Sequence, residues 1–334
     1  LLSNALGRAG QNIKSGNMTP KQLSYFTRIA ECGSFSAASK ALLIAQPALS
    51  LQIANLETEL GLALFIRKPR GVALTESGAR LMPQAYGILR QIETTVLDIQ
   101  SAELEPQGAV RVGMSPALNN VLAPRLASAI NARYPRVELE TIAGASRYLN
   151  QQLTERKIDI NLVHPDGDGI DPFSATPLLR EVLFFVGSSV NKYPHIKTRR
   201  GEKCIRFADL VNYKMLSTEV HDGLGFRLKQ YEIETGITLN KRRSFGQLLT
   251  DLNVILAGDA EMILPWSAIY HLANDERLVT AKVIEPAMER DVFMLTLPGQ
   301  PLTNTLVKTQ ALIKDLVGDI FREGRSVGVS LLEV

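Results

Sequence analysis

The sequence predicts an α/β protein in three parts: an N-terminal winged helix-turn-helix, a long linker helix, and a C-terminal domain of two α/β subdomains. Two short helical patterns meet at an abrupt polar turn within Gly33–Gly61. One long helical pattern runs from Glu76 to about Glu103, and strand and helix patterns alternate from Ala109 onward. With 334 residues, the chain is long enough for two or more domains that each bury a core.

The first helix of the pair is predicted to begin after Ser34, because serine is a favourable helix cap. Its apolar stripe consists of Phe35, Ala38, Leu42 and Leu43. Gln46-Pro47 opens the second helix, since proline fits the first turn, and Gly61 ends it. The second stripe consists of Leu49, Ile53, Leu56 and Leu60. Only Ile44 and Ala45 separate the helices, so the second helix is free to enter a DNA major groove.

Short polar side chains near the start of the second helix, at Gln46, Ser50 and Gln52, are candidates for contacts with base edges. An alanine-rich helical hairpin fits this stretch equally well, so the flanking sequence decides. Downstream, two apolar strands flank the basic turn Lys68–Gly71, which is typical of a wing. Upstream, Thr19-Pro20 opens another helix. The context therefore favours a winged helix-turn-helix.

The run from Ala45 to Gly78, AQPALSLQIANLETELGLALFIRKPRGVALTESG, resembles the LysR-type transcriptional regulators. Turn, recognition helix, wing and the following Thr75-Glu76-Ser77-Gly78 match in order, and the resemblance covers the chain from Met18. It implies a sequence-specific DNA-binding regulator of transcription and no enzyme activity. The candidate DNA-binding residues are Ser34, Gln46, Pro47, Ser50, Leu51, Gln52, Arg67 and Arg70.

Leu51 departs from the family pattern, which usually has Arg or Gln at this position of the recognition helix. The change removes a base or phosphate contact. We therefore expect Gln46, Pro47, Ser50 and the wing residue Arg70 to carry more of the DNA recognition.

Composition is that of an ordinary globular protein, 45% hydrophobic and 21% charged, and the net charge of +3 indicates nucleic acid only weakly. No apolar run approaches a membrane span, so no membrane partner is expected. Cys32 and Cys204 form neither a metal motif nor a disulfide scaffold, which favours a reducing cytoplasm. Residues 1–17 lack an apolar period and a signal-peptide pattern, and are predicted to be a mobile extension ahead of Met18.

The long helix carries apolar residues at alternating spacings of four and three, which is typical of a coiled-coil seam. They are Ala85, Leu89, Ile92, Val96 and Ile99. A helix packed on its own head domain is the alternative. The resemblance implies a dimer through this linker helix, and a tetramer beyond it, with recognition helices on half-sites about 10 bp apart. Residues 76–108 would form the linker and hinge, after a DNA-binding domain of residues 18–75.

Beyond the hinge, a βαβαβ series predicts a largely parallel sheet. Its strands are Ala109–Met114, Val137–Ile142 and Ile158–Val163, and its helices are Leu118–Ala132 and Tyr148–Glu155. A second series begins near Val182–Gly187. It includes helices Gly225–Thr235 and Gln247–Ala257, strands Ala260–Leu264 and Val292–Leu297, and a final helix Asn304–Phe321. Two α/β halves match the periplasmic-binding-protein-like effector domain that the resemblance implies, over residues 109–330.

A ligand of such a domain would sit between the halves, at the carboxyl ends of strands. The candidate effector-binding residues are Ser115, Ser146, His164, Thr218, His221 and Phe245. The helix starts at Ser115 and Ser146 favour an anion, although a serine there can also serve as a helix cap alone. His164 can equally be a loop histidine with its hydrogen bonds satisfied.

Two segments depart from a simple pattern. Gly258-Asp259-Ala260 replaces the family's usual Gly-x-Gly turn, which leaves the wall of the cleft undefined. The segment Ser188–Lys203, rich in Lys, Arg and His, is interpreted as an enlarged solvated loop. Enzyme motifs are weak, because the histidines lack metal-ligand spacing and no nucleophile-base pair or dinucleotide fingerprint stands out.

The sequence thus predicts a cytoplasmic, homo-oligomeric transcription factor without a bound cofactor or metal. Its expected partners are double-stranded promoter DNA, a second copy of itself, RNA polymerase, and a small-molecule co-inducer that is an organic anion. A small-molecule-binding or catalytic α/β protein with a helical oligomerisation head is the competing class.

Overall fold

The computed structural model describes residues 18–69, 71–101, 105–164, 170–218, 223–272, 274–300, 303–324 and 329–332. The extension predicted for residues 1–17 lies outside these ranges, as do the candidate site residues Arg70 and His221. The chain divides into two compact units, Leu1–Val96 and Leu97–Val334.

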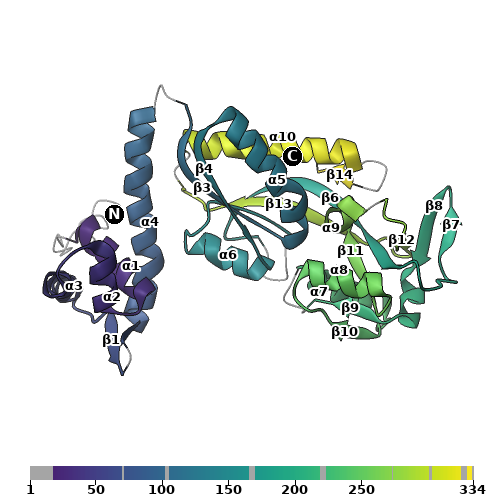
Figure 1. Ribbon diagram of the computed structural model, residues 1–334, viewed down its shortest axis with the longest axis horizontal. Coiled ribbons are helices and arrows are strands. Elements are labelled where there is room, and N and C mark those ends of the chain that lie inside the picture. The colour runs from purple at the N-terminus through teal and green to yellow at the C-terminus, as the bar shows by residue number, and fades with distance from the viewer. Residues whose placement is uncertain are drawn as a thin grey trace, which may run out of the picture. The chain divides into compact units, whose positions relative to one another are not determined.

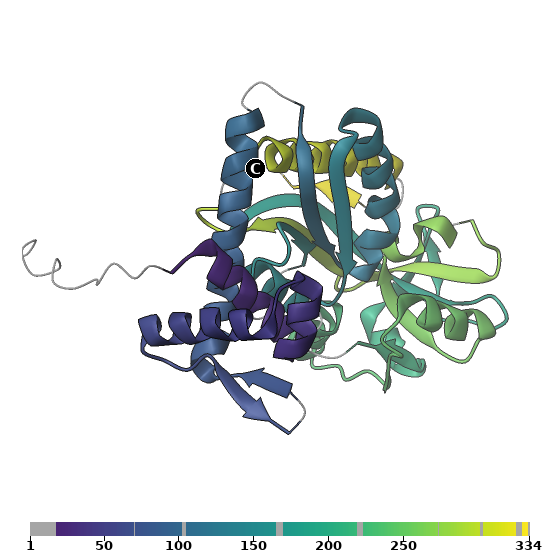
Figure 2. The same cartoon turned by 60° about the vertical axis from the view of Figure 1, so that its left-hand side comes forward.

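Three helices form the core of the first unit (Figures 1 and 2). They are α1 (Pro20–Cys32), α2 (Phe35–Leu42) and α3 (Gln46–Leu60). Thr19 forms a capping box with Gln22 at the start of α1, and the Ser34 hydroxyl accepts the Ala37 N–H at the start of α2. Their inner faces meet in one apolar cluster that includes Leu23, Phe26, Ile29, Ala38, Leu49, Ile53 and Leu56.

The wing is an antiparallel hairpin of β1 (Phe65–Lys68) and β2 (Gly71–Leu74). The Val72 N–H donates to the Gly33 carbonyl oxygen at 2.8 Å. Gly71 has φ +107°, and a Cβ there would collide with the same carbonyl oxygen. The wing is therefore held against the start of α2, and the predicted winged helix-turn-helix is confirmed.

The prediction that Leu43 and Leu60 belong to the buried apolar stripes is wrong. Leu43 follows the end of α2 in a left-handed conformation (φ 55°) and is 92% exposed. Leu60, the last residue of α3 before the left-handed Gly61, is 37% exposed. Both lie at helix ends, where the chain turns away before the side chain can reach the core.

The linker helix α4 (Glu76–Ser101) begins in the first unit, and its apolar stripe serves two environments. Ala85 is fully buried and Leu89 is partly buried against the helical core. Ile92 and Val96, farther along the same stripe, are 40% and 48% exposed, as is the neighbouring Ile88 at 38%. The predicted continuous seam is therefore wrong for its first two members, and the side chain of Ile99 lies outside the described residues.

In the second unit, a first lobe has three parallel strands in the order β4-β3-β5. They are β3 (Gln107–Met114), β4 (Arg136–Ala143) and β5 (Ile160–Val163). Helices α5 (Pro116–Arg133) and α10 (Asn304–Gly324) pack on one face in the main core, and α6 (Ser146–Thr154) packs on the other. The predicted βαβαβ series is confirmed (Figure 1).

A second lobe follows the order β10-β9-β11-β6 and continues through β12, β8 and β7. Its strands are β7 (Lys197–Arg199), β8 (Glu202–Arg206), β9 (Met215–Ser217), β10 (Lys241–Arg243), β11 (Glu261–Pro265) and β12 (Leu278–Ile284). α7 (Gly223–Thr235) packs on one face. α8 (Leu248–Ala257) and the short α9 (Trp266–Ile269) pack on the other. Two 3-10 turns complete the lobe, Phe207–Asn212 and Tyr270–Leu272.

Two long strands join the lobes: β6 (Ser174–Ser188) and β13 (Glu289–Thr296). The first half of β6 pairs with β13 and with the terminal β14 (Val329–Leu331), whereas its second half pairs with β11 and β12. β13 also pairs with β5. β6 thus belongs to both lobes, and only its second half is almost continuously buried, so the sequence pattern located that half alone.

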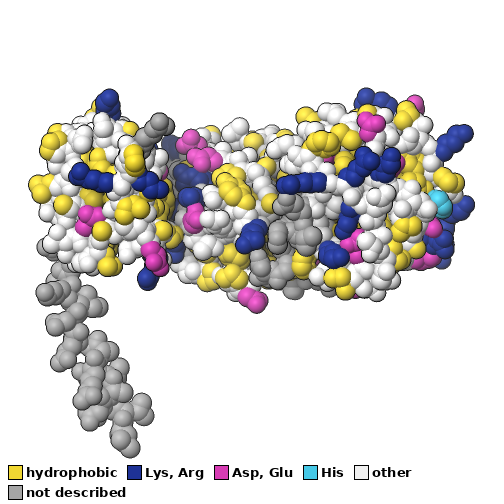
Figure 3. All heavy atoms as spheres, turned by 90° about the horizontal axis from the view of Figure 1, so that it is seen from below, with side chains coloured by type: hydrophobic (Ala, Val, Ile, Leu, Met, Phe, Trp, Pro, Cys, Tyr) yellow, Lys and Arg dark blue, Asp and Glu magenta, His cyan; other side chains and the backbone are white. Residues whose placement is uncertain are grey.

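The loop predicted for Ser188–Lys203 contains β7 and the start of β8, which form an antiparallel hairpin, so that prediction is wrong. Lys197, Arg199 and Lys203 are nevertheless exposed, and Figure 3 shows basic side chains gathered at this end of the second lobe. β7 is exposed throughout, and the buried residues of β8, Cys204 and Ile205, are adjacent, so neither strand shows the alternation of apolar and polar residues that predicts a strand. Among the described residues, no helix combines the length and hydropathy that a bilayer-spanning segment needs.

Candidate functional site

The exposed face of α3 carries apolar and amide side chains. Gln46, Pro47 and Leu51 are exposed, Leu51 to 60%, whereas Ser50 and Gln52 are half-buried. Residues 46–60 include no Lys or Arg. The helix can therefore offer hydrogen bonds and apolar contacts to base edges, while contacts from cations to phosphates must come from elsewhere.

The wing supplies cations next to this helix in the same unit. Arg67 and Lys68 lie exposed on β1. Ser34 is half-buried, and its hydroxyl accepts the Ala37 N–H at 3.4 Å, so its role in the structure is that of a helix cap. The predicted DNA contacts of these residues stay predictions.

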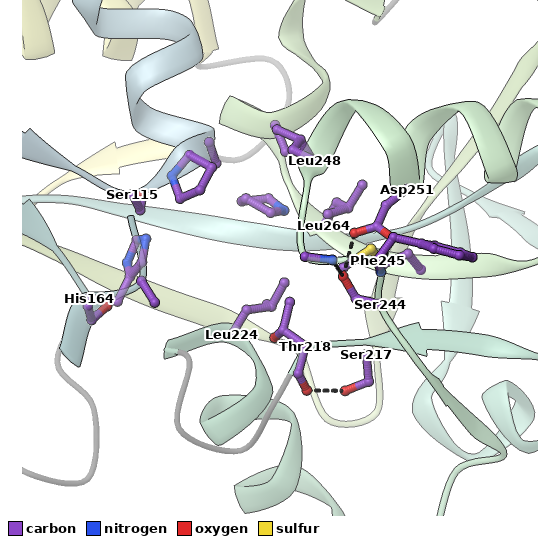
Figure 4. A pocket seen from close by; sticks show the side chains of 18 of the residues that line it. Ser115, His164, Ser217, Thr218, Leu224, Ser244, Phe245, Leu248, Asp251 and Leu264 are labelled. Carbon is purple, nitrogen blue, oxygen red and sulfur yellow. Dashed lines mark hydrogen bonds between the residues drawn. The ribbon is translucent and has the colours of Figure 1, made fainter. Parts of the chain in front are cut away.

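A pocket of about 380 Å³ lies between the two lobes of the second unit. Five of the six predicted effector-binding residues line it: Ser115, Ser146, His164, Thr218 and Phe245. The sixth, His221, lies outside the described residues. Figure 4 shows Ser115 and His164 facing Thr218, Ser244 and Phe245 across the pocket. Apolar side chains complete the wall, including Leu224, Leu248, Met262 and Leu264.

On the first lobe, Ser115 and Ser146 lie where strands end and helices begin. Ser115 occupies the cap position of α5, yet its hydroxyl makes no capping bond and is buried without a hydrogen-bond partner among the described residues. Ser146 is the first residue of α6, and the cap position belongs to Ala145. The interpretation of these serines as simple helix caps is therefore wrong. Both helix starts face the pocket, where their first N–H groups favour negative charge.

On the second lobe, Thr218 follows β9, and its hydroxyl is likewise buried and unpartnered among the described residues. Asp251 holds the segment of Ser244 and Phe245 in place on the same lobe. Its carboxylate accepts the Ser244 hydroxyl at 2.5 Å and the Phe245 N–H at 2.9 Å. The Phe245 side chain remains 62% exposed at the mouth of the pocket.

A buried ion pair lies beside the pocket, on the strands that join the lobes. Arg290 of β13 and Glu181 of β6 are direct cross-strand partners, and the Arg290 Nη2 lies 2.8 Å from the Glu181 Oε2. The second Glu181 oxygen accepts the Ser267 N–H at 3.2 Å. Arg290 lines the pocket, but it lies near the start of a strand with no local motif, so sequence reasoning missed it. No local sequence signal could have indicated it, because ligand contacts are expected at the carboxyl ends of strands and Arg290 lies at the amino end of β13.

His164 follows β5 and is 4% exposed. Its Nδ1 lies 2.8 Å from the backbone carbonyl oxygen of Asp291 on β13, whereas its Nε2 has no partner among the described residues. Burial and the nearby Arg290 cation hold the pKa of the imidazole well below its usual range, so the ring is neutral at pH 7. The interpretation of His164 as a histidine with all its hydrogen bonds satisfied is therefore wrong.

The described residues contain no group of three or more His, Cys, Asp or Glu side chains that could hold a metal ion. The pocket instead combines hydroxyls, the neutral imidazole of His164, the charged side chains of Arg243, Asp251 and Arg290, two helix starts and an apolar wall. Such a site can bind a small organic molecule.

Two family models match the chain: the bacterial regulatory helix-turn-helix protein of the lysR family at residues 20–79, and the LysR substrate binding domain at residues 104–317. The chain belongs to the LysR family of transcriptional regulators. The predicted family and fold class are thus confirmed. The family is one of regulators and combines a DNA-binding helix-turn-helix with a substrate-binding domain.

Curated relatives agree with this assignment. The nitrogen assimilation regulatory protein nac of Escherichia coli is 35% identical over 173 residues, which cover 51% of this chain and only 56% of nac. The E. coli dual regulator OxyR is 26% identical over 286 residues, which cover 85% of this chain and 91% of OxyR.

Solved structures of LysR regulators share the fold. A full-length OxyR variant from Pseudomonas aeruginosa has a TM-score of 0.70 at 20% identity, and the match covers 90% of this chain and 95% of that one. Full-length CbnR complexed with its target DNA has a TM-score of 0.64 at 18% identity, and the match covers 90% of this chain and all of that one.

Proposed function

We propose that this LysR-family regulator binds promoter DNA through α3 and the wing, and that a small organic anion in the pocket between the lobes controls its activity. The observation that carries the effector role is the pocket itself. Both lobes contribute to it, and Ser115, His164 and Thr218 present buried polar atoms without partners among the described residues. Such atoms cost free energy unless a ligand or water satisfies them.

Negative charge on the effector follows from the two helix starts. α5 and α6 both begin at the pocket, and neither has a side-chain cap, so the N–H groups of their first turns, beginning at Ala117 in α5 because Pro116 has none, are available to an anion. The Asp251 carboxylate is bound by Ser244 and Phe245, which holds it at the rim on the other lobe. The co-inducer we propose is therefore a carboxylate with an apolar body.

DNA recognition is assigned to Gln46, Pro47 and Leu51 on the exposed face of α3, with Ser50 and Gln52 beside them. Arg67 supplies a phosphate contact from the wing, together with Arg70 on sequence grounds. A dimer through the exposed half of the α4 stripe would place two such heads on one operator, with a tetramer and RNA polymerase as further partners at the promoter.

The test is fluorescence anisotropy of the purified protein on its own upstream intergenic DNA, against scrambled duplex at matched salt. Gln46→Ala should weaken binding to the specific duplex more than to the scrambled one, because an amide reads base edges. Arg67→Ala should weaken both and reduce the salt slope by about one. Lys197→Ala, an exposed cation of the second lobe, is the control. Equal weak binding to all duplexes would reject the DNA-binding role.

A further inference from the structure

The hydrogen bond of His164 to the main chain fixes which of its nitrogens carries the proton. A carbonyl oxygen can only accept, so the Nδ1 that lies 2.8 Å from the Asp291 oxygen must be the donor. In a neutral imidazole the other nitrogen then has a lone pair and no hydrogen. Nε2 is therefore a hydrogen-bond acceptor.

This acceptor is buried at the pocket. His164 lines the cavity and is 4% exposed, and Nε2 has no partner among the described residues. Protonation would turn Nε2 into a donor, but burial and Arg290 hold the pKa of the ring well below its usual range. The imidazole thus meets a ligand in its neutral form.

The other unpartnered groups of the pocket are less selective than His164. The hydroxyls of Ser115 and Thr218 can rotate to donate or to accept. They can bind a carboxylate, an ether or a hydroxyl with similar geometry. Nε2 demands a donor, so it discriminates between ligands that differ only in a hydroxyl or N–H group.

We propose that His164 makes the regulator selective for hydroxy acids: a carboxylate with a hydroxyl that donates to Nε2 and a small hydrocarbon body against Leu224, Leu248 and Leu264. This inference rests on the proposed effector role of the pocket. A hydroxyl fits better than an ammonium, because the helix starts disfavour a cation and the carboxylate that lines the pocket, Asp251, already accepts the Ser244 hydroxyl and the Phe245 N–H. An analogue without the hydroxyl would leave the buried Nε2 acceptor unpaired, and an unpaired buried group is the strongest basis for rejecting an analogue.

Matched probes test this on the full-length protein. Isothermal titration would compare mandelate with phenylacetate, which lacks the hydroxyl, and with α-methoxyphenylacetate, which keeps the oxygen but cannot donate. Lactate, propionate and 2-methoxypropionate form a second, smaller series. We expect the hydroxy acid of at least one series to bind about tenfold or more tightly than both analogues.

His164→Phe removes the acceptor and keeps an aromatic ring. It should reduce the preference for hydroxy acid over deoxy acid to about one, with the affinity for phenylacetate retained as the sign of an intact pocket. His164→Gln, whose amide oxygen accepts, should restore part of the preference. Nitrogen-15 spectra of histidine-labelled protein should show the His164 proton on Nδ1.

The outcomes separate the two claims. Equal affinity of wild type for hydroxy, deoxy and methoxy acids, an unchanged preference in His164→Phe, or a proton on Nε2 would overturn the role of His164 while leaving the effector pocket in place. Failure of every acid to bind would overturn the effector role as well, and the hydroxy-acid selectivity with it.

Discussion

Leu51 shows how one residue can set what a DNA-binding helix recognises. It is 60% exposed on a helix without cations, where an Arg or Gln would read guanine or adenine. An exposed leucine in the major groove has one apolar partner, the C5 methyl group of thymine. Leu51 is mostly exposed and adds little to the packing of the domain, so we propose that it contributes to recognition.

Replacement of thymine by deoxyuridine removes only that methyl group. For each half-site in which the contacted thymine is replaced, we expect wild-type protein to lose about fourfold in affinity, the value of one buried methyl. Leu51→Ala should bind the thymine duplex more weakly and no longer respond to the replacement. Anisotropy titrations with the four combinations form the cycle, and cytosine to 5-methylcytosine at an uncontacted position is the control. An undiminished response in Leu51→Ala would show that another residue contacts the methyl.

Residues at strand ends were predictable because a rule connects sequence to place: Ser115, Ser146, His164 and Thr218 each follow a strand or open a helix, and all line the pocket. Arg290 was not, because its place depends on pairing with a strand far along the chain, and Asp251 was not, because it lies within helix α8 and not at a strand end. Arg290 meets Glu181 across 109 positions of sequence. The sequence could not show that Ser115 and Ser146 do not cap their helices, because a serine at a helix start can serve either as a cap or as a ligand contact.

The helix α4 carries one apolar stripe that lies in two environments. The spacing of Ala85, Leu89, Ile92 and Val96 indicates one apolar stripe, and the structure contains that stripe. The pattern alone does not say what covers it. The first half packs on the helical core of its own unit, and the second half is exposed, so both readings of the sequence apply to different turns of one helix.

The exposed half should therefore hold the dimer. Ile92→Glu places a charge in the proposed seam, where a partner would have to desolvate it, so we expect the particle to fall to the 36.7 kDa monomer in light scattering. Affinity for a full operator should fall toward that of a half-site. Gln91→Glu adds the same charge at an exposed position outside the stripe and is the control. A variant that stays dimeric would move the interface away from this helix.

The joining strands β6 and β13 carry a buried charge pair that the fold must keep intact. Glu181→Gln would leave Arg290 buried without a counter-ion, and we expect a loss of about 3–5 kcal/mol in the free energy of unfolding. Urea titration followed by circular dichroism measures it. Glu289 is the neighbour of Arg290 on β13 and a half-exposed partner of Arg180 on β6. Glu289→Gln should cost less than about 1 kcal/mol. Equal effects of the two changes would mean that the buried pair is solvated.

At the scale of the whole molecule, regulation requires that the pocket and the DNA-binding head respond to each other. Coupling is a difference in effector affinity between two states, and it needs contacts that differ between them. A ligand that touches both lobes would provide such contacts, because closure would bring Ser115 of the first lobe and Thr218 of the second to the same molecule. The strands β6 and β13 run between the lobes, so we expect closure to be a motion about the strands that hold the Arg290–Glu181 pair.

Single and double removal of the two hydroxyls tests this bridge. Ser115→Ala and Thr218→Val should each weaken the tightest-binding acid of the probe series about five- to tenfold, the net value of one hydrogen bond. The double variant should lose less than the product of the two, because a ligand released by one lobe no longer draws in the other. Anisotropy on operator DNA should show unchanged affinity without acid in all three variants and a reduced response with it. A loss in only one of the single variants, or a full DNA response in the double variant, would mean that the acid acts from one lobe only, and strictly additive losses would mean that the two contacts are independent.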